Sequence, residues 1–282
     1  MDVKLFQQYA GKLPASELMP VLFFGHGSPM NAIEDNIFTK GWRESVRDLP
    51  KPSVILCISA HWETRGTFVT AMEKPRTIHD FGGFPPELYN VNYPAHGSPE
   101  LAIEAHNAVT RTNIGLDEHW GLDHGCWSVL IKAYPDADIP VVQLSLDYTQ
   151  PPQYHFDLAK EIAALRRKGV LIVGSGNIVH NLRMLDWQNQ TGGFDWAIEA
   201  NAKFIELIQQ SDYASLINYD RLGKACQLSV PTPEHYLPFL YTMALKDEHE
   251  KVTFFNDQLV MGSISMLSLK IDNATVNGRG YL

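Results

Sequence analysis

Cysteine is scarce in this sequence, and no apolar run is long enough to cross a membrane. The 282 residues include three cysteines, Cys57, Cys126 and Cys226, which are widely spaced and form no CxxC pair. Such cysteines provide neither a disulfide framework nor a zinc–thiolate site. A membrane-spanning helix needs about 20 consecutive apolar residues, and the N-terminal segment lacks the pattern of a signal peptide. We therefore expect a cytoplasmic protein with no membrane partner.

Positive charge is also in the minority. The chain has 23 Lys and Arg against 32 Asp and Glu, a formal net charge of -9. Nucleic-acid binding needs a basic face, so no nucleic-acid partner is expected. Apolar residues make up 45% of the chain, enough for a large core. Because no repeat or linker-like composition interrupts it, we expect residues 1–282 to form a single domain.

Short apolar runs rich in β-branched residues alternate with helical patterns. The expected strands are Val21–Phe24, Ser53–Ser59, Thr67–Met72, Pro140–Leu146, Val170–Val173, Val252–Asn256 and Ser263–Ile271. The expected helices are Asn36–Arg47, Pro99–Thr110, Trp127–Ala133, Tyr154–Arg167, Trp196–Gln209 and Glu234–Leu245. This alternation predicts an α/β fold whose central sheet is mostly parallel, or mixed, and flanked by helices. Residues 73–96, rich in Pro, Gly and aromatics, fit an ordered functional loop.

Three histidines follow predicted strands. His26 comes after VLFFG, His61 after ILCISA, and His180 after VLIVGSGNIV. Ligands of open α/β sheets bind outside the carboxyl ends of the strands, where these imidazoles can meet. Neutral imidazole is a good ligand for zinc and iron(II). The three together predict one divalent metal site, although each alone also fits a hydrogen-bonded core or turn position.

Two further histidines stand at predicted helix starts. In PTPEHY, Thr232 can cap a helix with Pro233 at its first position, which places His235 in the first turn. Glu234 there would complement the helix dipole, whereas a charged His235 would not. His124, in LDHGCW, precedes the helix at 127–133. Of the other histidines, we expect surface positions for His106, His155 and His249, and also for His96 and His119.

Several of these segments resemble one known family. GHGSPM around His26, SAHW around His61, TIHDFGGFP, LDHGCW, GSGNIVHNL, PTPEHYLP and MGSISMLS follow one another over nearly the whole chain. In this order the sequence resembles the class III extradiol ring-opening dioxygenases, in particular the DOPA 4,5-dioxygenase branch. The resemblance implies an enzyme that opens the ring of a catechol such as DOPA with O2 at a mononuclear non-haem metal.

The resemblance also implies roles for the histidines. His26, His61 and His235 would bind the metal, although more distant members use a carboxylate as third ligand, which keeps Glu234 as an alternative. His180 would be an acid/base residue or a fourth ligand. His124 would be an acid/base or substrate-orienting residue. The expected cofactor is one divalent metal per chain, iron(II) for catalysis and zinc in the protein as isolated.

Aromatic residues near these histidines are candidate substrate contacts. The loop segment from His79 to Pro85, with His79 and Phe84, is a candidate wall for the aromatic ring. Trp62 and Tyr236 each adjoin a site histidine, and core packing explains them equally well. No residue stands out as a partner for a substrate carboxylate or amine. Arg65 and Arg76 are possible candidates for that role, and surface positions fit both better.

Two other functions are compatible with the same residues. A zinc hydrolase would use metal-bound water with Glu234 or His124 as base. A non-enzymatic relative would keep the fold as a binding module, against which the presence of all five site histidines argues. Catechol and O2 are the expected small-molecule partners, and the sequence does not indicate an oligomeric state.

Overall fold

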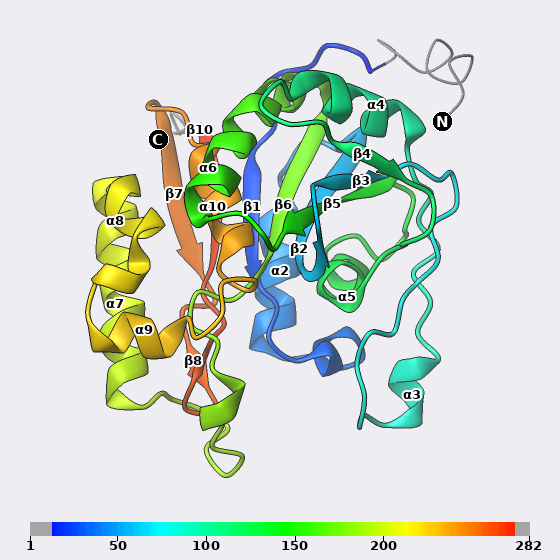
Figure 1. Ribbon diagram of the computed structural model, residues 1–282. Coiled ribbons are helices and arrows are strands. Elements are labelled where there is room, and N and C mark those ends of the chain that lie inside the picture. The colour runs from blue at the N-terminus through cyan, green and yellow to red at the C-terminus, as the bar shows by residue number, and fades with distance from the viewer. Residues whose placement is uncertain (1–12, 274–282) are drawn as a thin grey trace, which may run out of the picture.

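The computed structural model describes residues 13–273, which contain one large mixed β-sheet. Its eight strands run in the order β4-β3-β5-β2-β6-β1-β10-β7 (Figure 1). They are β1 (Val21–Gly25), β2 (Val54–Thr64), β3 (Phe68–Thr70), β4 (Gly115–Asp117), β5 (Val141–Asp147), β6 (Val170–Gly176), β7 (Glu250–Phe255) and β10 (Ser268–Asn273). The central strands β5, β2, β6 and β1 are parallel, and β10, β7 and β3 pair antiparallel. The predicted α/β class with a mostly parallel, mixed sheet is confirmed.

Helices cover both faces of the sheet. One face carries α10, α6 and α4, and α5 and α2 cover the other (Figure 1). The α-helices are α2 (Ile37–Val46), α3 (Pro86–Tyr89), α4 (Pro99–Ala108), α5 (His124–Ala133), α6 (Pro152–Glu161), α7 (Asp195–Gln210), α8 (Tyr213–Ile217), α9 (Lys224–Ser229) and α10 (Leu237–Ala244). Short 3-10 helices are η1 (Pro29–Ala32), η2 (Ile162–Lys168), η3 (Leu182–Met184) and η4 (Tyr219–Arg221). A small hairpin joins β8 (Leu259–Val260) to β9 (Ile264–Ser265).

Several predicted elements differ from the structure. The helix expected over 127–133 already begins at His124. The helix expected over 154–167 changes at Ile162 from α6 into η2, and the strand expected over 263–271 is divided into β9 and β10. The helix expected from Glu234 begins only at Leu237. The Thr232 hydroxyl binds the Glu234 carboxylate at 2.9 Å rather than capping a backbone N–H. His235 therefore lies in a turn before α10, not in the first turn of the helix.

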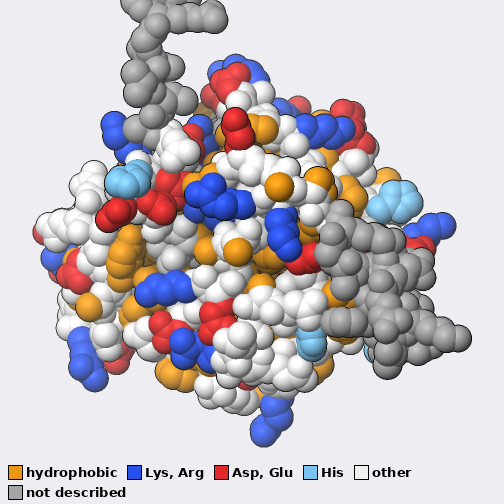
Figure 2. All heavy atoms as spheres, turned by 90° about the horizontal axis from the view of Figure 1, so that it is seen from above, with side chains coloured by type: hydrophobic (Ala, Val, Ile, Leu, Met, Phe, Trp, Pro, Cys, Tyr) orange, Lys and Arg blue, Asp and Glu red, His pale blue; other side chains and the backbone are white. Residues whose placement is uncertain are grey.

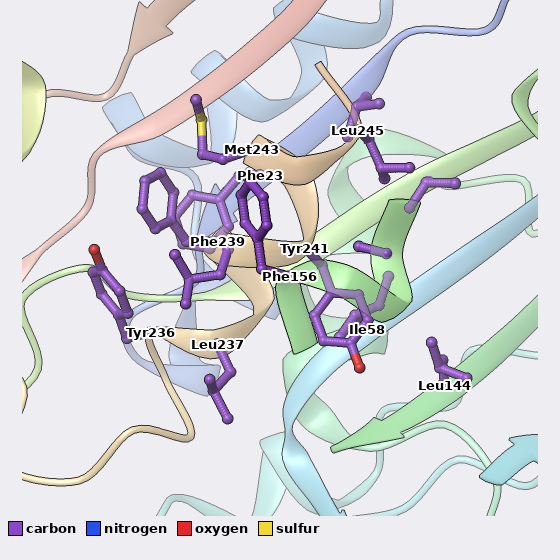
Figure 3. Packing of buried hydrophobic residues seen from close by; sticks show 14 of the residues in the cluster. Phe23, Ile58, Leu144, Phe156, Tyr236, Leu237, Phe239, Tyr241, Met243 and Leu245 are labelled. Atoms are coloured by element: carbon purple, nitrogen blue, oxygen red, sulfur yellow. The ribbon is translucent and has the colours of Figure 1, made fainter. Parts of the chain in front are cut away.

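The central strands are buried on both faces, as their continuous apolar sequences require. Every residue of β1 is buried, and alternate side chains enter two separate clusters. Phe23 points into the cluster under α10, where its ring meets that of Phe239 edge-on with centroids 5.7 Å apart (Figure 3). Phe24 enters the opposite cluster and packs against Trp42 of α2. Packing on both faces holds β1 in place, and with it the position of His26 just past its end.

One prediction about surface residues is wrong, because His155 of α6 is fully buried. Its Nδ1 lies 3.1 Å from the Tyr241 hydroxyl of α10. Burial lowers the pKa of His155 from 6.5 to about 4, so the folded protein holds this ring neutral. The sequence pattern of α6 did not indicate that His155 is buried, because this helix packs against more than one neighbouring element.

The His155 shift predicts a loss of stability in mild acid. In the unfolded chain His155 becomes protonated near pH 6.5, whereas in the folded chain it stays neutral down to about pH 4. Stability is therefore complete above pH 6.5 and falls as the pH drops toward 4, by about 3 kcal/mol from this residue. Between pH 7 and pH 4.5, urea unfolding of the His155→Phe variant should show about 2 kcal/mol less pH dependence than that of the natural chain. Parallel curves for the two proteins would contradict the assignment.

A buried ion pair joins η2 to the β7 edge. Arg166 and Glu250 are 2% and 1% exposed in their side chains, and the guanidinium binds both carboxylate oxygens. Arg166 also donates to the carbonyls of Met19 and Leu245 at 2.8 and 2.7 Å. The pair therefore connects three segments of chain.

Removing one member of this pair should be costly. Glu250→Gln leaves the Arg166 charge buried without its counterion, which typically costs about 3–5 kcal/mol. The double replacement of Arg166 and Glu250 by methionine should recover much of that loss, because no charge remains buried. Urea unfolding measures both. A single variant as stable as the natural chain would show that the pair contributes little.

The outer surface carries both signs of charge. Figure 2 shows Lys and Arg side chains next to Asp and Glu over the face seen from above. Within residues 13–273 no helix is long and apolar enough to span a membrane. The three cysteines are all free and buried.

Candidate metal centre

The carboxyl edge of the parallel strands brings the five predicted site histidines together. His26 follows β1, and its backbone N–H donates to the Gly176 carbonyl at the end of β6 at 3.0 Å. His61 lies on β2, within the stretch from Ile58 to Glu63 where the pairing of β2 with β5 shifts register. Strand β6 lies between β1 and β2. His26 and His61 therefore converge from either side of the β6 end, which leads on toward His180.

Glycines make this approach possible. A Cβ atom on Gly176 would lie 2.2 Å from the backbone oxygen of His235, so only glycine lets this turn pack against the β6 end. A Cβ atom on Gly125 would lie 2.7 Å from the His61 ring. The two glycines thus admit His235 and the start of α5 to the edge of the sheet.

His26, His61 and His235 form a nearly equilateral set. Their ring centroids are 5.1, 5.3 and 5.0 Å apart. Three imidazole nitrogens about 2.1 Å from one ion would place the ring centroids about 5 Å from one another. The Nε2 atoms of His26 and His61 are 3.4 Å apart, the spacing of two ligands on a tetrahedral ion. The three rings fit a shared divalent metal.

Hydrogen bonds on the far side of these rings set which nitrogen faces the centre. The Ser175 hydroxyl donates to the Gly125 carbonyl and therefore accepts from Nδ1 of His26, 3.0 Å away. The Glu234 carboxylate accepts from Nδ1 of His235 at 3.1 Å. Both histidines thus present an unprotonated Nε2. Partners of this kind orient metal-binding histidines and fix their tautomers.

Burial keeps these imidazoles neutral. It lowers the pKa of His26 and His235 far below 6.5, and the neighbouring rings lower both further. The pKa of His61 falls to about 3 and that of His180 to about 4, again chiefly through burial. Neutral rings whose lone pairs face one another favour a cation between them. The donor set therefore fits zinc or iron(II).

His124 opens α5 beside this set and is held by Asp80. The Asp80 carboxylate accepts from the backbone N–H of His124 at 2.8 Å and from its Nδ1 at 2.9 Å. Burial alone would raise the pKa of Asp80, but the hydrogen bonds from His124 outweigh it and the pKa is lowered. The ionised carboxylate can only accept, so Nδ1 of His124 carries a proton and Nε2 is free. His124 is thus oriented as a proton acceptor.

Asp123, next in the chain, fixes the start of α5. Its buried carboxylate caps the helix by accepting from the Cys126 N–H at 3.0 Å. It also accepts from Ser59 of β2 at 2.6 Å and from Gln143 of β5 at 2.7 Å. The helix that carries His124 is therefore tied to the two strands beneath it.

His180 stacks on His235. The ring centroids are 3.5 Å apart and the planes differ by 10°. Possible ligand atoms form two groups with no member in common, each within 4.8 Å: His26, His61 and His124, and His180, Glu234 and His235. The ring of His235, 5.3 and 5.0 Å from those of His26 and His61, joins the two groups. All five predicted histidines, with Glu234, are thus in one place.

A cavity of about 460 Å³ opens over the histidines. Its walls are mostly apolar, and they include Phe84 from the predicted aromatic loop, together with Phe81. The other three predicted substrate contacts do not line it. His79 packs behind Phe81 and bonds to the Val91 carbonyl at 2.9 Å. Trp62 stacks on Trp120, and Tyr236 is buried with its hydroxyl on the Leu216 carbonyl. Both residues stand next to a site histidine in the sequence, but their side chains point into the core instead of the cavity.

Sequence reasoning missed Asp80 and Ser175 as partners of site histidines. Asp80 stands in the quoted segment TIHDFGGFP, but its contact with His124 joins residues 44 positions apart. Ser175 lies in GSGNIVHNL, where the glycines drew attention instead. A serine or an acidic residue in a segment that ends at the carboxyl edge of the sheet is the sequence signal that could have identified these partners.

Fold and site together define a metal centre at the carboxyl edge of an α/β sheet. A family model described as the catalytic LigB subunit of aromatic ring-opening dioxygenase matches residues 21–259. The chain therefore belongs to this family, the class III extradiol dioxygenases, and is an enzyme of that class.

Relatives from bacteria and plants agree with this assignment. The chain is 49% identical over 265 residues to a protein of Escherichia coli K12 named 4,5-DOPA dioxygenase extradiol, covering 91% of this chain and 96% of the relative. It is 35% identical to a protein of the same name from Beta vulgaris, covering 88% and 94%. A crystal structure of uncharacterized protein JW3007 from Escherichia coli K12 matches with a TM-score of 0.78 at 43% identity, over 90% of this chain and all of that one. The hydrolase alternative is not favoured by these matches.

Proposed function

We propose that this enzyme opens the aromatic ring of a catechol such as DOPA, by 4,5-cleavage, with one divalent metal held by His26, His61 and His235. One observation carries the proposal: the Nε2 atoms of His26 and His61 face each other 3.4 Å apart. The other ring nitrogen of His26, Nδ1, is hydrogen-bonded to the Ser175 hydroxyl. The name shared by the relatives supports the substrate. Iron(II) is the proposed catalytic metal and zinc the metal of the isolated protein, since nitrogen ligands hold both.

The metal, when bound, would supply a Lewis acid for the diol and a site at which dioxygen reacts. The surrounding residues would do the rest. Nε2 of His124 is free to take a proton from a catechol hydroxyl, because Asp80 fixes the proton of Nδ1. His180, neutral at physiological pH and stacked on His235, would move a second proton or serve as a fourth ligand. Phe81 and Phe84 would hold the ring against the largely apolar wall of the cavity.

Oxygen uptake tests this function. The protein, loaded with iron(II) without oxygen, should consume one O2 per DOPA and form a yellow ring-opened product, and the zinc-loaded protein should not, because zinc does not change its redox state. Oxygen uptake absent from protein that holds one iron per chain would refute the proposal. An ester or amide cleaved by the zinc form would instead favour the hydrolase.

The same proposal includes a single catalytic domain over residues 1–282 in the cytoplasm. The continuous eight-stranded sheet and the three free, buried thiols support it.

A further inference from the structure

The charged side chains in the wall of the cavity over the histidines are of one sign, negative. Of the cavity-lining residues that the structure describes, Glu34 is charged and none is Lys or Arg. Arg65 and Arg76, the two arginines singled out in the sequence, do not line it, and Arg76 donates to the Trp120 carbonyl at 3.0 Å. A carboxylate on a bound substrate would therefore find no side-chain cation in the cavity wall.

The groups behind the histidines have the same sign. Asp80 bonds to His124 and Glu234 to His235. Neither carboxylate lines the cavity, but both add negative charge near its floor, and Glu34 adds it at the wall. Moving a carboxylate from water into such a site costs free energy that no partner returns. A cationic substituent would gain attraction in the same place.

Aromatic side chains complete the features that favour a cation. Phe81, Phe84 and Trp187 line the same cavity as Glu34. Trp187 is 71% exposed, so its ring stands at the side of the cavity that meets solvent. A carboxylate combined with aromatic faces is a common way of binding an ammonium group. The net charge of -9 would also attract cations toward the protein.

We infer that Glu34 is a specificity-determining residue that pairs with an ammonium group on the substrate, so the preferred substrate is a catechol bearing an amine and no carboxylate. This inference rests on the proposed ring-opening function and narrows its substrate class. DOPA, which carries both groups, ranks below the corresponding amine. Catechols with an acidic side chain rank last.

Four catechols distinguish this order: dopamine, DOPA, neutral 4-methylcatechol and 3,4-dihydroxyphenylacetate. The measurement is kcat/KM from oxygen uptake by the iron(II)-loaded protein at low ionic strength. The kcat/KM for dopamine should be about tenfold higher than that for 3,4-dihydroxyphenylacetate, because the amine gains an ion pair where the acid has an unpaired charge. An acid turned over as well as the amine overturns the inference and leaves the ring-opening function intact. If none of the four consumes oxygen, the ring-opening function itself fails.

A matched pair of variants assigns the preference to Glu34. Glu34→Gln should lower the kcat/KM ratio of dopamine to 4-methylcatechol about two- to fivefold, mainly through KM, because the lost ion pair is an exposed one. Asp35→Asn removes the neighbouring carboxylate, which pairs with Arg43 and Lys132 and does not line the cavity. That variant should keep the natural ratio. An unchanged ratio in Glu34→Gln, or an equal fall in both variants, overturns the assignment.

Discussion

Replacing His61 with alanine is expected to abolish metal binding, and His26→Ala should do the same. Each substitution removes one neutral imidazole from a set of three whose ring centroids lie about 5 Å apart. Loss of a partner behind a ligand costs about 10- to 100-fold in metal affinity, so loss of a ligand itself should cost more. Metal content after dialysis, with competition by a chelator, measures the effect.

The His249→Ala variant is the matched control. His249 lies in an exposed turn, with a side chain 82% exposed, and contributes nothing to the centre. It should retain about the natural metal content in the same assay. Circular dichroism should show the natural fold in all three variants, because the strands beneath the site are held by buried apolar side chains. Full metal content in either site variant would refute the ligand set.

The second large effect concerns catalysis without loss of metal. His124→Ala should retain the metal but lower kcat by about 10²–10⁴-fold, because His124 is proposed to accept the proton of the substrate hydroxyl. Asp80→Asn should give a smaller loss, since an amide at this position can donate and no longer holds the Nδ1 proton in place. Iron content and oxygen uptake are measured on the same samples.

The outcome of that experiment separates two arrangements. His124 also lies within ligand reach of His26 and His61. If His124→Ala lost its metal and His235→Ala kept it, His124 would be the third ligand in place of His235. Unchanged turnover in His124→Ala would remove this residue from the mechanism altogether.

The edge of the sheet could be predicted from the sequence because its signals are local. Continuous apolar runs before His26 and His61 indicate strands buried on both faces, and parallel strands bring their carboxyl ends to one edge. The glycine-flanked turns next to these runs mark where the chain leaves the sheet. Burial of β1 on both faces agrees with this interpretation.

The orientation of side chains around the centre could not be predicted in this way. Asp80 reaches His124, and Ser175 reaches His26, across long stretches of chain. Trp62 and Tyr236 do not line the cavity; the first stacks on Trp120 and the second is buried with its hydroxyl on the Leu216 carbonyl. The burial of His155 likewise depends on α10 packing against α6. Such contacts are set by tertiary packing, on which local sequence patterns carry no information.

Anomalous diffraction from crystals grown with zinc or iron(II) tests the central claim most directly. The arrangement of the rings predicts one strong peak per chain, about 2.1 Å from nitrogens of His26, His61 and His235. Two separate peaks, or one peak held by His180 and Glu234 but distant from His26 and His61, would contradict it.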